Sequence, residues 1–226
     1  MTTAAPETPT PEAQTQDTAP AAEASEAPVR KRPKPGERRV QILQALATML
    51  EQPGAERITT AALAARLEVS EAALYRHFAS KAQMFEGLIE FIEQTVFGLV
   101  NQLGEREPDA RARCRKLVAL LLQFGEKNPG MTRVMVGDAL VFENERLQQR
   151  MNLFFDKIES TLRQNLREAA TLNGAETPTV DAQADASVIT AFCVGRLQRF
   201  ARSGFKRSPS ESLEHGLALL LPGGAV

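Results

Sequence analysis

Apolar residues along most of this chain recur every three or four positions, which is the spacing of an amphipathic helix, and no segment sustains the alternation of a strand. Residues 37–51 show the first such pattern, with Val40, Ile42, Leu46 and Leu50 among its apolar positions. Ser80 predicts the start of a helix of about 20 residues. The same spacing predicts later helices over residues 108–127, 131–142, 144–170, 181–203 and 209–221, with a loop over 171–180. We therefore expect an all-α protein of about nine helices.

Residues 58–78 indicate two short helices joined by a tight turn. Thr59 and Ser70 are suitable N-cap residues for the first and the second helix. Each helix has two apolar positions four residues apart, which are Leu63 and Leu67 in the first and Leu74 and Phe78 in the second. The outward positions of the second helix are Glu71, Ala72, Tyr75, Arg76 and His77. Small residues ahead of a polar, cationic set suit a recognition helix in the major groove of DNA. The alternative is an ordinary helical hairpin.

Charge is distributed unevenly along the chain. The net charge of the 226 residues is −1, but residues 1–29 contain five acidic residues and no Lys or Arg. From Arg30 to Lys81, ten Lys and Arg residues stand against five Asp and Glu residues. A phosphate backbone responds to local charge, so the segment with the helix pair is compatible with nucleic-acid binding.

The composition predicts three parts in the chain. Residues 1–36 are rich in Ala, Pro, Thr and Glu and nearly lack large apolar side chains, so we expect them to be disordered. Residues 30–35 form a basic arm, which is either a solvated linker or a phosphate or minor-groove contact. We expect a DNA-binding domain over 37–82 and a larger helical domain over 83–222.

Other functional classes find no support in the sequence. Cys114 and Cys193 are single cysteines in helical surroundings, so we expect buried thiols rather than a disulfide or a metal site. The longest apolar run, residues 117–122, is far too short to span a bilayer, and no signal peptide is recognisable, which favours a cytoplasmic protein. No nucleophile–base pair, phosphate loop or metal spacing is present, so we expect neither an enzyme nor a cofactor. No acidic residue or cysteine lies at useful spacing from His77, and the only other histidine is His215, which argues against a catalytic or metal-binding role.

The helix pair resembles the TetR-type regulators. The residues that carry the resemblance are Ile58, Thr59, Leu63, Ala64, Val69, Ser70, Leu74, Tyr75, Phe78, Ser80 and Lys81. Glu68 departs from the family pattern, which has Gly in the turn. A left-handed backbone at Glu68 would cost about 1 kcal/mol.

Segments outside the helix pair resemble the nucleoid occlusion factors within that family. They are residues 88–93, 124–130, 139–143, 146–148, 191–193 and 205–206. This resemblance implies a homodimer, formed through the last two helices at about 181–221, that binds palindromic sites dispersed over the chromosome. It also implies nucleoid association and antagonism of the tubulin-like division protein FtsZ when the protein is bound to DNA.

The resemblance also implies which residues contact DNA and the partner protein. The implied DNA-contacting set is Thr59, Thr60, Ser70, Glu71, Ala72, Tyr75, Arg76, His77 and Lys81. Of these, we expect Thr59, Thr60, Tyr75 and Lys81 to contact phosphates, and Arg76 or His77 to read base edges or reach a phosphate deep in the groove. Tyr75 could instead point into the small domain.

The implied FtsZ-contacting set is Phe91, Leu120, Lys127 and Asn128. Phe91 is alternatively a core residue, and Lys127 and Asn128 also suit a helix C-terminus for structural reasons. The competing function is a transcriptional repressor that a small-molecule inducer releases from its operator. Such a repressor needs an apolar pocket with a few polar groups, whereas the Leu- and Phe-rich central helices look able to fill their own interior.

Overall fold

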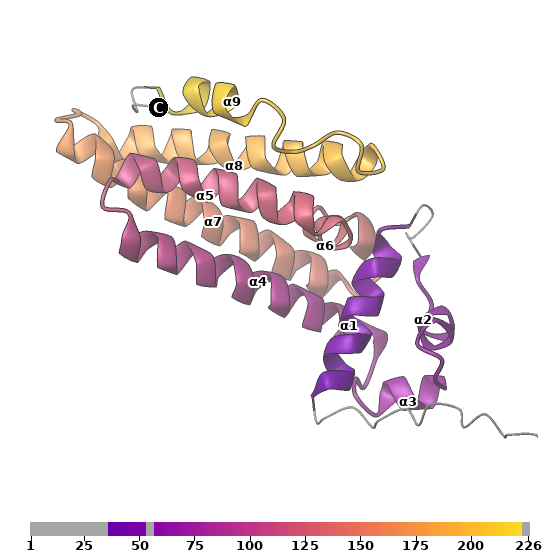
Figure 1. Ribbon diagram of the computed structural model, residues 1–226. Helices are drawn as coiled ribbons and strands as arrows, with labels where there is room; N and C mark the ends of the chain where they lie inside the picture. Colours follow the sequence, from indigo (N-terminus) through magenta and orange to yellow (C-terminus); the bar gives the residue numbers. More distant parts are fainter. Residues whose placement is uncertain (1–35, 53–56, 223–226) are drawn as a thin grey trace, which may run out of the picture. The chain divides into compact units, whose positions relative to one another are not determined.

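The computed structural model describes residues 36–52 and 57–222, and every regular element within these ranges is a helix (Figure 1). The α-helices are α1 (Glu37–Leu50), α2 (Thr60–Arg66), α3 (Glu71–Tyr75), α4 (Lys81–Arg106), α5 (Ala110–Lys127), α6 (Pro129–Met135), α7 (Glu145–Leu172), α8 (Pro178–Arg202) and α9 (Leu213–Leu220), and the 3₁₀ helix η2 (Asp138–Leu140) precedes α7. The predicted all-α class is confirmed for this part of the chain. The predictions for the tail and its basic arm fall outside the described residues.

Local capping starts three of the first four helices where the sequence predicts. The hydroxyl oxygens of Thr59, Ser70 and Ser80 accept from the backbone N–H group of the third residue of α2, α3 and α4, at donor–acceptor distances of 3.1, 3.2 and 3.2 Å. Each of these bonds satisfies an N–H group that has no partner within the helix. The short α2 and α3 are therefore held at fixed starting points.

The turn between α2 and α3 is a Schellman motif with a non-glycine residue at its left-handed position. Glu68 has φ 52°. The N–H of Val69 donates to the carbonyl of Ala64, and that of Glu68 donates to the carbonyl of Ala65. This pattern closes a helix through a left-handed residue, which is usually Gly. Glu68 thus adopts the left-handed backbone to which the predicted cost applies, and the turn keeps its geometry although a side chain is present.

Helices α4, α5, α7 and α8 lie side by side and form the larger core (Figure 1). Large aliphatic side chains such as Ile92, Leu121, Leu162 and Leu197 fill its interior at 1% exposure or less. Helix α1 packs against α2, α4 and α6, and α6 in turn packs against α5 and α8. The three N-terminal helices therefore meet the larger core through α4 and α6.

One predicted helix, residues 131–142, is wrong. The structure instead has α6, which begins at Pro129 and ends at Met135, followed by Gly137 at φ 85° and the short η2. Pro129 suits the first turn because it has no N–H to satisfy. The left-handed Gly137 then redirects the chain, which apolar spacing alone does not reveal.

Other predictions need smaller corrections. Val40 is 53% exposed rather than buried, because two residues correspond to about 200° around a helix and place it opposite Ile42. Pro108 precedes α5, whose N-cap is Asp109. The loop predicted over 171–180 ends earlier, since Pro178 occupies the first turn of α8, and the last helix begins at Leu213 rather than at 209.

Candidate nucleic-acid interface

Helices α2 and α3 are anchored by a few buried apolar side chains. Ile58, Leu63, Leu74 and Phe78 are each at most 7% exposed. Helix α3 ends at Tyr75, so Arg76 and His77 lie in the turn that follows and not in the helix. The buried positions thus fix the helix pair, and the intervening positions face outward.

The exposed side of α3 and of this turn carries most of the predicted DNA-contacting residues. Ser70, Glu71, Ala72, Arg76 and His77 are all exposed. Tyr75 is 45% exposed, which favours the outward orientation over the inward one. A phenol, a guanidinium and an imidazole therefore face solvent within three consecutive positions.

Arg39 of α1 supports the turn from behind, and sequence reasoning missed it. Its guanidinium donates to the carbonyl oxygen of His77 at 3.0 Å and lies 4.2 Å from the ring centroid of Phe78. Both contacts hold the backbone beside Arg76 and His77. Because 38 residues separate Arg39 from His77, no local pattern in the sequence indicates the contact.

The hydroxyl groups predicted to contact phosphates differ in their availability. Thr59 uses its oxygen to accept from the N–H of Ala62, which leaves its own proton free to be donated. Thr60 instead donates its proton to a carboxylate oxygen of Glu71 at 2.5 Å. A phosphate can therefore be bound by Thr59 with the present bonding intact, whereas Thr60 must first leave Glu71.

Lys81, at the start of α4, forms an ion pair with Glu143 in the segment before α7. The side chain of Glu143 is only 9% exposed and that of Lys81 is 27% exposed. The ammonium group also lies 5.7 Å from the ring centroid of Phe85. Lys81 is thus already neutralised by a buried carboxylate, a partner that the sequence did not indicate.

The predicted partner-binding residues lie on α4 and α5, which pack against each other (Figure 1). Phe91, in the first half of α4, is 46% exposed, so the alternative of a fully buried core residue is not observed. Leu120 is half-buried and Lys127 is exposed, both in the second half of α5. Asn128 is the C-cap residue that follows α5, and its side-chain N–H donates to the carbonyl of Phe124 at 2.8 Å.

The two cysteines are buried thiols, as the sequence predicts. Cys114 and Cys193 are buried, and burial raises the pKa of each thiol to about 12. In residues 36–52 and 57–222, no group of three His, Cys, Asp or Glu side chains could hold a metal ion. None of the helices described is both long enough and apolar enough to cross a membrane.

Family models match both parts of the chain. Residues 42–88 match the model described as bacterial regulatory proteins, tetR family. Residues 109–222 match the model SlmA-like_C, described as a tetracyclin repressor-like C-terminal domain. The two matches together cover the helix pair and α5 through α9.

Two relatives that match most of the chain carry the same name. The chain is 52% identical over 188 residues to the nucleoid occlusion factor SlmA of Vibrio vulnificus strain YJ016, covering 83% of this chain and 95% of the relative. It is 53% identical over 178 residues to the protein of that name from Escherichia coli O9:H4 strain HS, covering 78% and 89%.

Solved structures agree on the fold. The structure is similar to the fatty acid degradation regulator FadR of Bacillus halodurans, with a TM-score of 0.68, 15% identity, and coverage of 83% of this chain and 96% of that one. It is also similar to a TetR-family transcriptional regulator from Bordetella parapertussis 12822, with a TM-score of 0.64, 17% identity, and coverage of 83% and 96%. The fold is that of the TetR-family regulators. Because the chain is more than half identical to these relatives over most of its length, it belongs to the nucleoid occlusion factor SlmA family of TetR-type proteins.

Proposed function

We propose that this protein binds palindromic chromosomal sites as a homodimer and, when bound, antagonises FtsZ assembly over the nucleoid. The observation that carries the proposal is the exposed Tyr75, Arg76 and His77 beside a short capped helix, in a chain of this family. Residues 37–82 act as the DNA-binding domain and residues 83–222 as the dimerisation and partner-binding domain. Association with the nucleoid follows from DNA binding.

The proposed DNA contacts divide into positioning and reading. Thr59 and Tyr75 donate hydroxyl protons to backbone phosphates, which sets the register of α3 without reading sequence. Arg76 and His77 reach base edges or a phosphate deep in the groove. Ser70 and Ala72 lie at the front of α3, where their small side chains allow close approach, and Glu71 lies between them with its carboxylate bonded to Thr60.

Lys81 binds a phosphate only by leaving Glu143. Loss of its partner leaves a carboxylate that is nine-tenths buried, and this cost opposes DNA binding. Glu143→Gln should therefore raise DNA affinity at all sites alike, while Lys81→Gln should lower it and reduce the salt slope by about one. Unchanged affinity and an unchanged salt slope in both variants would remove Lys81 from the proposed interface.

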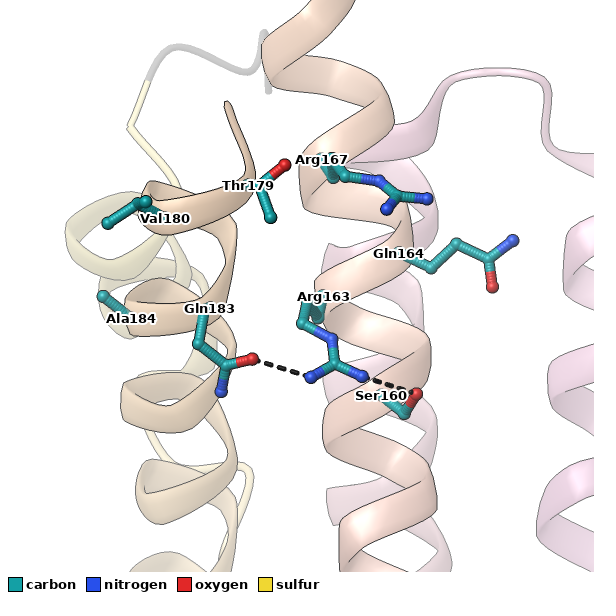
Figure 2. A pocket seen from close by; sticks show the side chains of 8 residues that line it. All are labelled: Ser160, Arg163, Gln164, Arg167, Thr179, Val180, Gln183 and Ala184. Atoms are coloured by element: carbon teal, nitrogen blue, oxygen red, sulfur yellow. Dashed lines mark hydrogen bonds between the residues drawn. The ribbon is translucent and has the colours of Figure 1, made fainter. Parts of the chain in front are cut away.

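The homodimer forms through α7 and α8, which differs from the expected pairing of the last two helices. A groove between α7 and α8 is lined by Ser160, Arg163, Gln164, Arg167, Thr179, Val180, Gln183 and Ala184 (Figure 2). Leu172, Val180 and Val188 on the same two helices are 58–79% exposed, as apolar residues of an unpartnered face would be. Helix α9 instead buries Leu213 and Leu217, and α9 packs against α8 of its own chain. A second copy is the occupant that the TetR-type fold supports.

FtsZ is proposed to bind where α4 and α5 meet. Phe91 offers an exposed aromatic anchor, Leu120 a half-buried apolar contact, and Lys127 an exposed cation at the end of α5. An aromatic anchor of this kind contributes most when a partner desolvates it. Asn128 holds the end of α5 through its bond to Phe124, so we assign it a positioning role beside Lys127.

The test is FtsZ polymer turnover, measured with the purified protein in the presence and absence of its cognate DNA duplex. We expect DNA-bound wild type to accelerate turnover. Phe91→Ala should bind DNA normally without this effect, and Arg76→Ala should lose the effect together with DNA binding. If DNA-bound wild type leaves the polymers unchanged while a metabolite releases it from the duplex, the inducible-repressor alternative replaces the proposal.

A further inference from the structure

The end of α8 and the loop after it carry a dense group of cationic side chains. A cavity of about 510 Å³ lies there, lined by Arg196, Arg199, Lys206, Arg207, Ser208 and Glu211. Four of these six residues are cations and one is a carboxylate, so the lining carries a net charge of +3. We call this set the α8-end pocket.

Its cations are not neutralised by the protein. In the described part of the chain, Arg199, Lys206 and Arg207 form no ion pair with a carboxylate. Arg196 is held in place by the backbone, because its guanidinium donates to the carbonyl oxygens of Pro209 and Glu211. The carboxylate of Glu211 offsets only one of the four positive charges around the cavity, so the cations repel one another unless a further anion binds.

The helix terminus explains only part of this arrangement. Arg199 lies in the last turn of α8, where a cation is favoured by the helix dipole. Lys206 and Arg207 lie beyond the helix and receive no such stabilisation. Their backbone N–H groups donate to the hydroxyl oxygen of Ser203 at 3.1 and 3.0 Å, after a left-handed turn at Gly204 and Phe205. The loop is thus folded so that its two cations lie at the same cavity as Arg199.

The loop itself is well anchored. The rings of Phe200 and Phe205 pack with centroids 5.2 Å apart, and the guanidinium of Arg133 lies 5.2 Å from the ring of Phe205. Ser208 donates its hydroxyl proton to Glu126 of α5. The loop backbone that carries Lys206 and Arg207 is thus held in one place, which limits the conformational freedom that is lost when a ligand binds.

We propose that the α8-end pocket binds a phosphate-bearing small molecule of the di- or triphosphate class. A guanidinium presents parallel N–H donors that match two phosphate oxygens, and an ammonium adds a point charge. The charge of +3 matches a polyphosphate better than a single carboxylate. The volume lies within the range of about 300–1,000 Å³ that is usual for small-ligand sites. The inference does not depend on FtsZ or on DNA binding.

Isothermal titration of the full-length, DNA-free protein with inorganic tripolyphosphate tests the proposal. We expect saturable binding that Arg199→Gln/Lys206→Gln weakens by about tenfold or more, which corresponds to loss of charge-assisted hydrogen bonds. The matched control is Arg106→Gln/Lys116→Gln, which removes one Arg and one Lys from exposed positions on α4 and α5. The control should bind within about twofold of wild type, as expected for charges outside the site. Arg196 is left intact because it holds the loop.

Three further measurements make the result decisive. ATP should compete with tripolyphosphate while adenosine should not, because the phosphates and not the base are recognised. Equal weakening in the test and control variants would show diffuse attraction and overturn the site. If Arg199→Gln/Lys206→Gln weakened binding of a DNA duplex but not of tripolyphosphate, the pocket would be a DNA contact and the proposal would be wrong. Arg76→Ala, which tests the recognition helix, should leave tripolyphosphate binding unchanged.

Discussion

Gly130, in the first turn of α6, lies directly against the backbone of α1. A Cβ atom at this position would lie 2.0 Å from the carbonyl oxygen of Ala47 and 3.3 Å from Cγ of Glu51. Ordinary contact begins at 3.4 Å, so Gly130→Ala requires a separation larger by 1.4 Å at the carbonyl oxygen. The carbonyl of Ala47 lies in the last turn of α1 and is part of the backbone, so it cannot rotate aside as a flexible side chain can. We therefore expect α1 and α6 to be forced apart.

The expected cost follows from two opposing terms. Overpacking of this kind typically costs about 1–3 kcal/mol. Replacing Gly by Ala within a helix otherwise contributes about 0.5–1 kcal/mol of stability. The net loss is about 1–2 kcal/mol, which lowers Tm by roughly 2–8 °C in a chain of this size.

The matched control is Gly104→Ala in α4. A Cβ atom there meets nothing within 4 Å, so only the favourable helix term remains and Tm should rise. Thermal unfolding followed by circular dichroism, with all variants at one protein concentration, measures the difference. If Gly130→Ala melted as high as Gly104→Ala, the close approach of α1 and α6 would not exist as described. A reduced DNA affinity in Gly130→Ala is expected as well, because α1 supports the turn after α3 through Arg39.

Three further outcomes are expected. Tyr75→Phe keeps the ring and removes the hydroxyl, so it should weaken binding to cognate and unrelated DNA duplexes alike, by about fivefold. A filter-binding or fluorescence assay measures the affinities. Weaker binding at the cognate site alone would show that Tyr75 reads a base. Cys114 and Cys193 should resist iodoacetamide at pH 8 in the folded protein and react after unfolding, because burial raises both thiol pKa values to about 12; rapid native labelling would contradict their burial. Phe91→Ala should change the unfolding free energy by less than about 1 kcal/mol, since the ring is 46% exposed, and a larger loss would indicate a core role.

Features that depend on a few adjacent residues could be predicted from the sequence. The N-caps at Thr59, Ser70 and Ser80 are local, since each hydroxyl bonds to an N–H three residues away. The left-handed turn at Glu68 is local in the same sense, because it closes on carbonyls of α2. Apolar spacing identified the long helices because one face of each is buried against the same core.

Features that depend on the approach of distant segments could not be predicted. The break of the helix predicted over 131–142 occurs where Gly137 packs against Gln148, a contact set by tertiary structure. The start of α6 at Pro129 was missed for a different reason. Pro129 and Gly130 in succession indicate the end of a helix, although Pro is also the residue best suited to a first turn. Composition marks a boundary without saying on which side the helix lies.

Lys81 shows why a site transferred by position needs its energetics from the structure. The position and the residue type of Lys81 both agree with a phosphate contact. The charge of Lys81 is nevertheless already matched by Glu143, which is 62 residues away. A lysine in water can bind phosphate at little cost, whereas this one must give up a buried carboxylate. The affinity that Lys81 contributes is then the difference between two ion pairs, and Glu143 sets its size. Because Glu143 lies in the segment before α7, any gain in DNA binding through Lys81 is linked to the packing of the larger core. The ammonium group of Lys81 makes phosphate binding possible, and the ion pair with Glu143 determines how strongly Lys81 binds the phosphate.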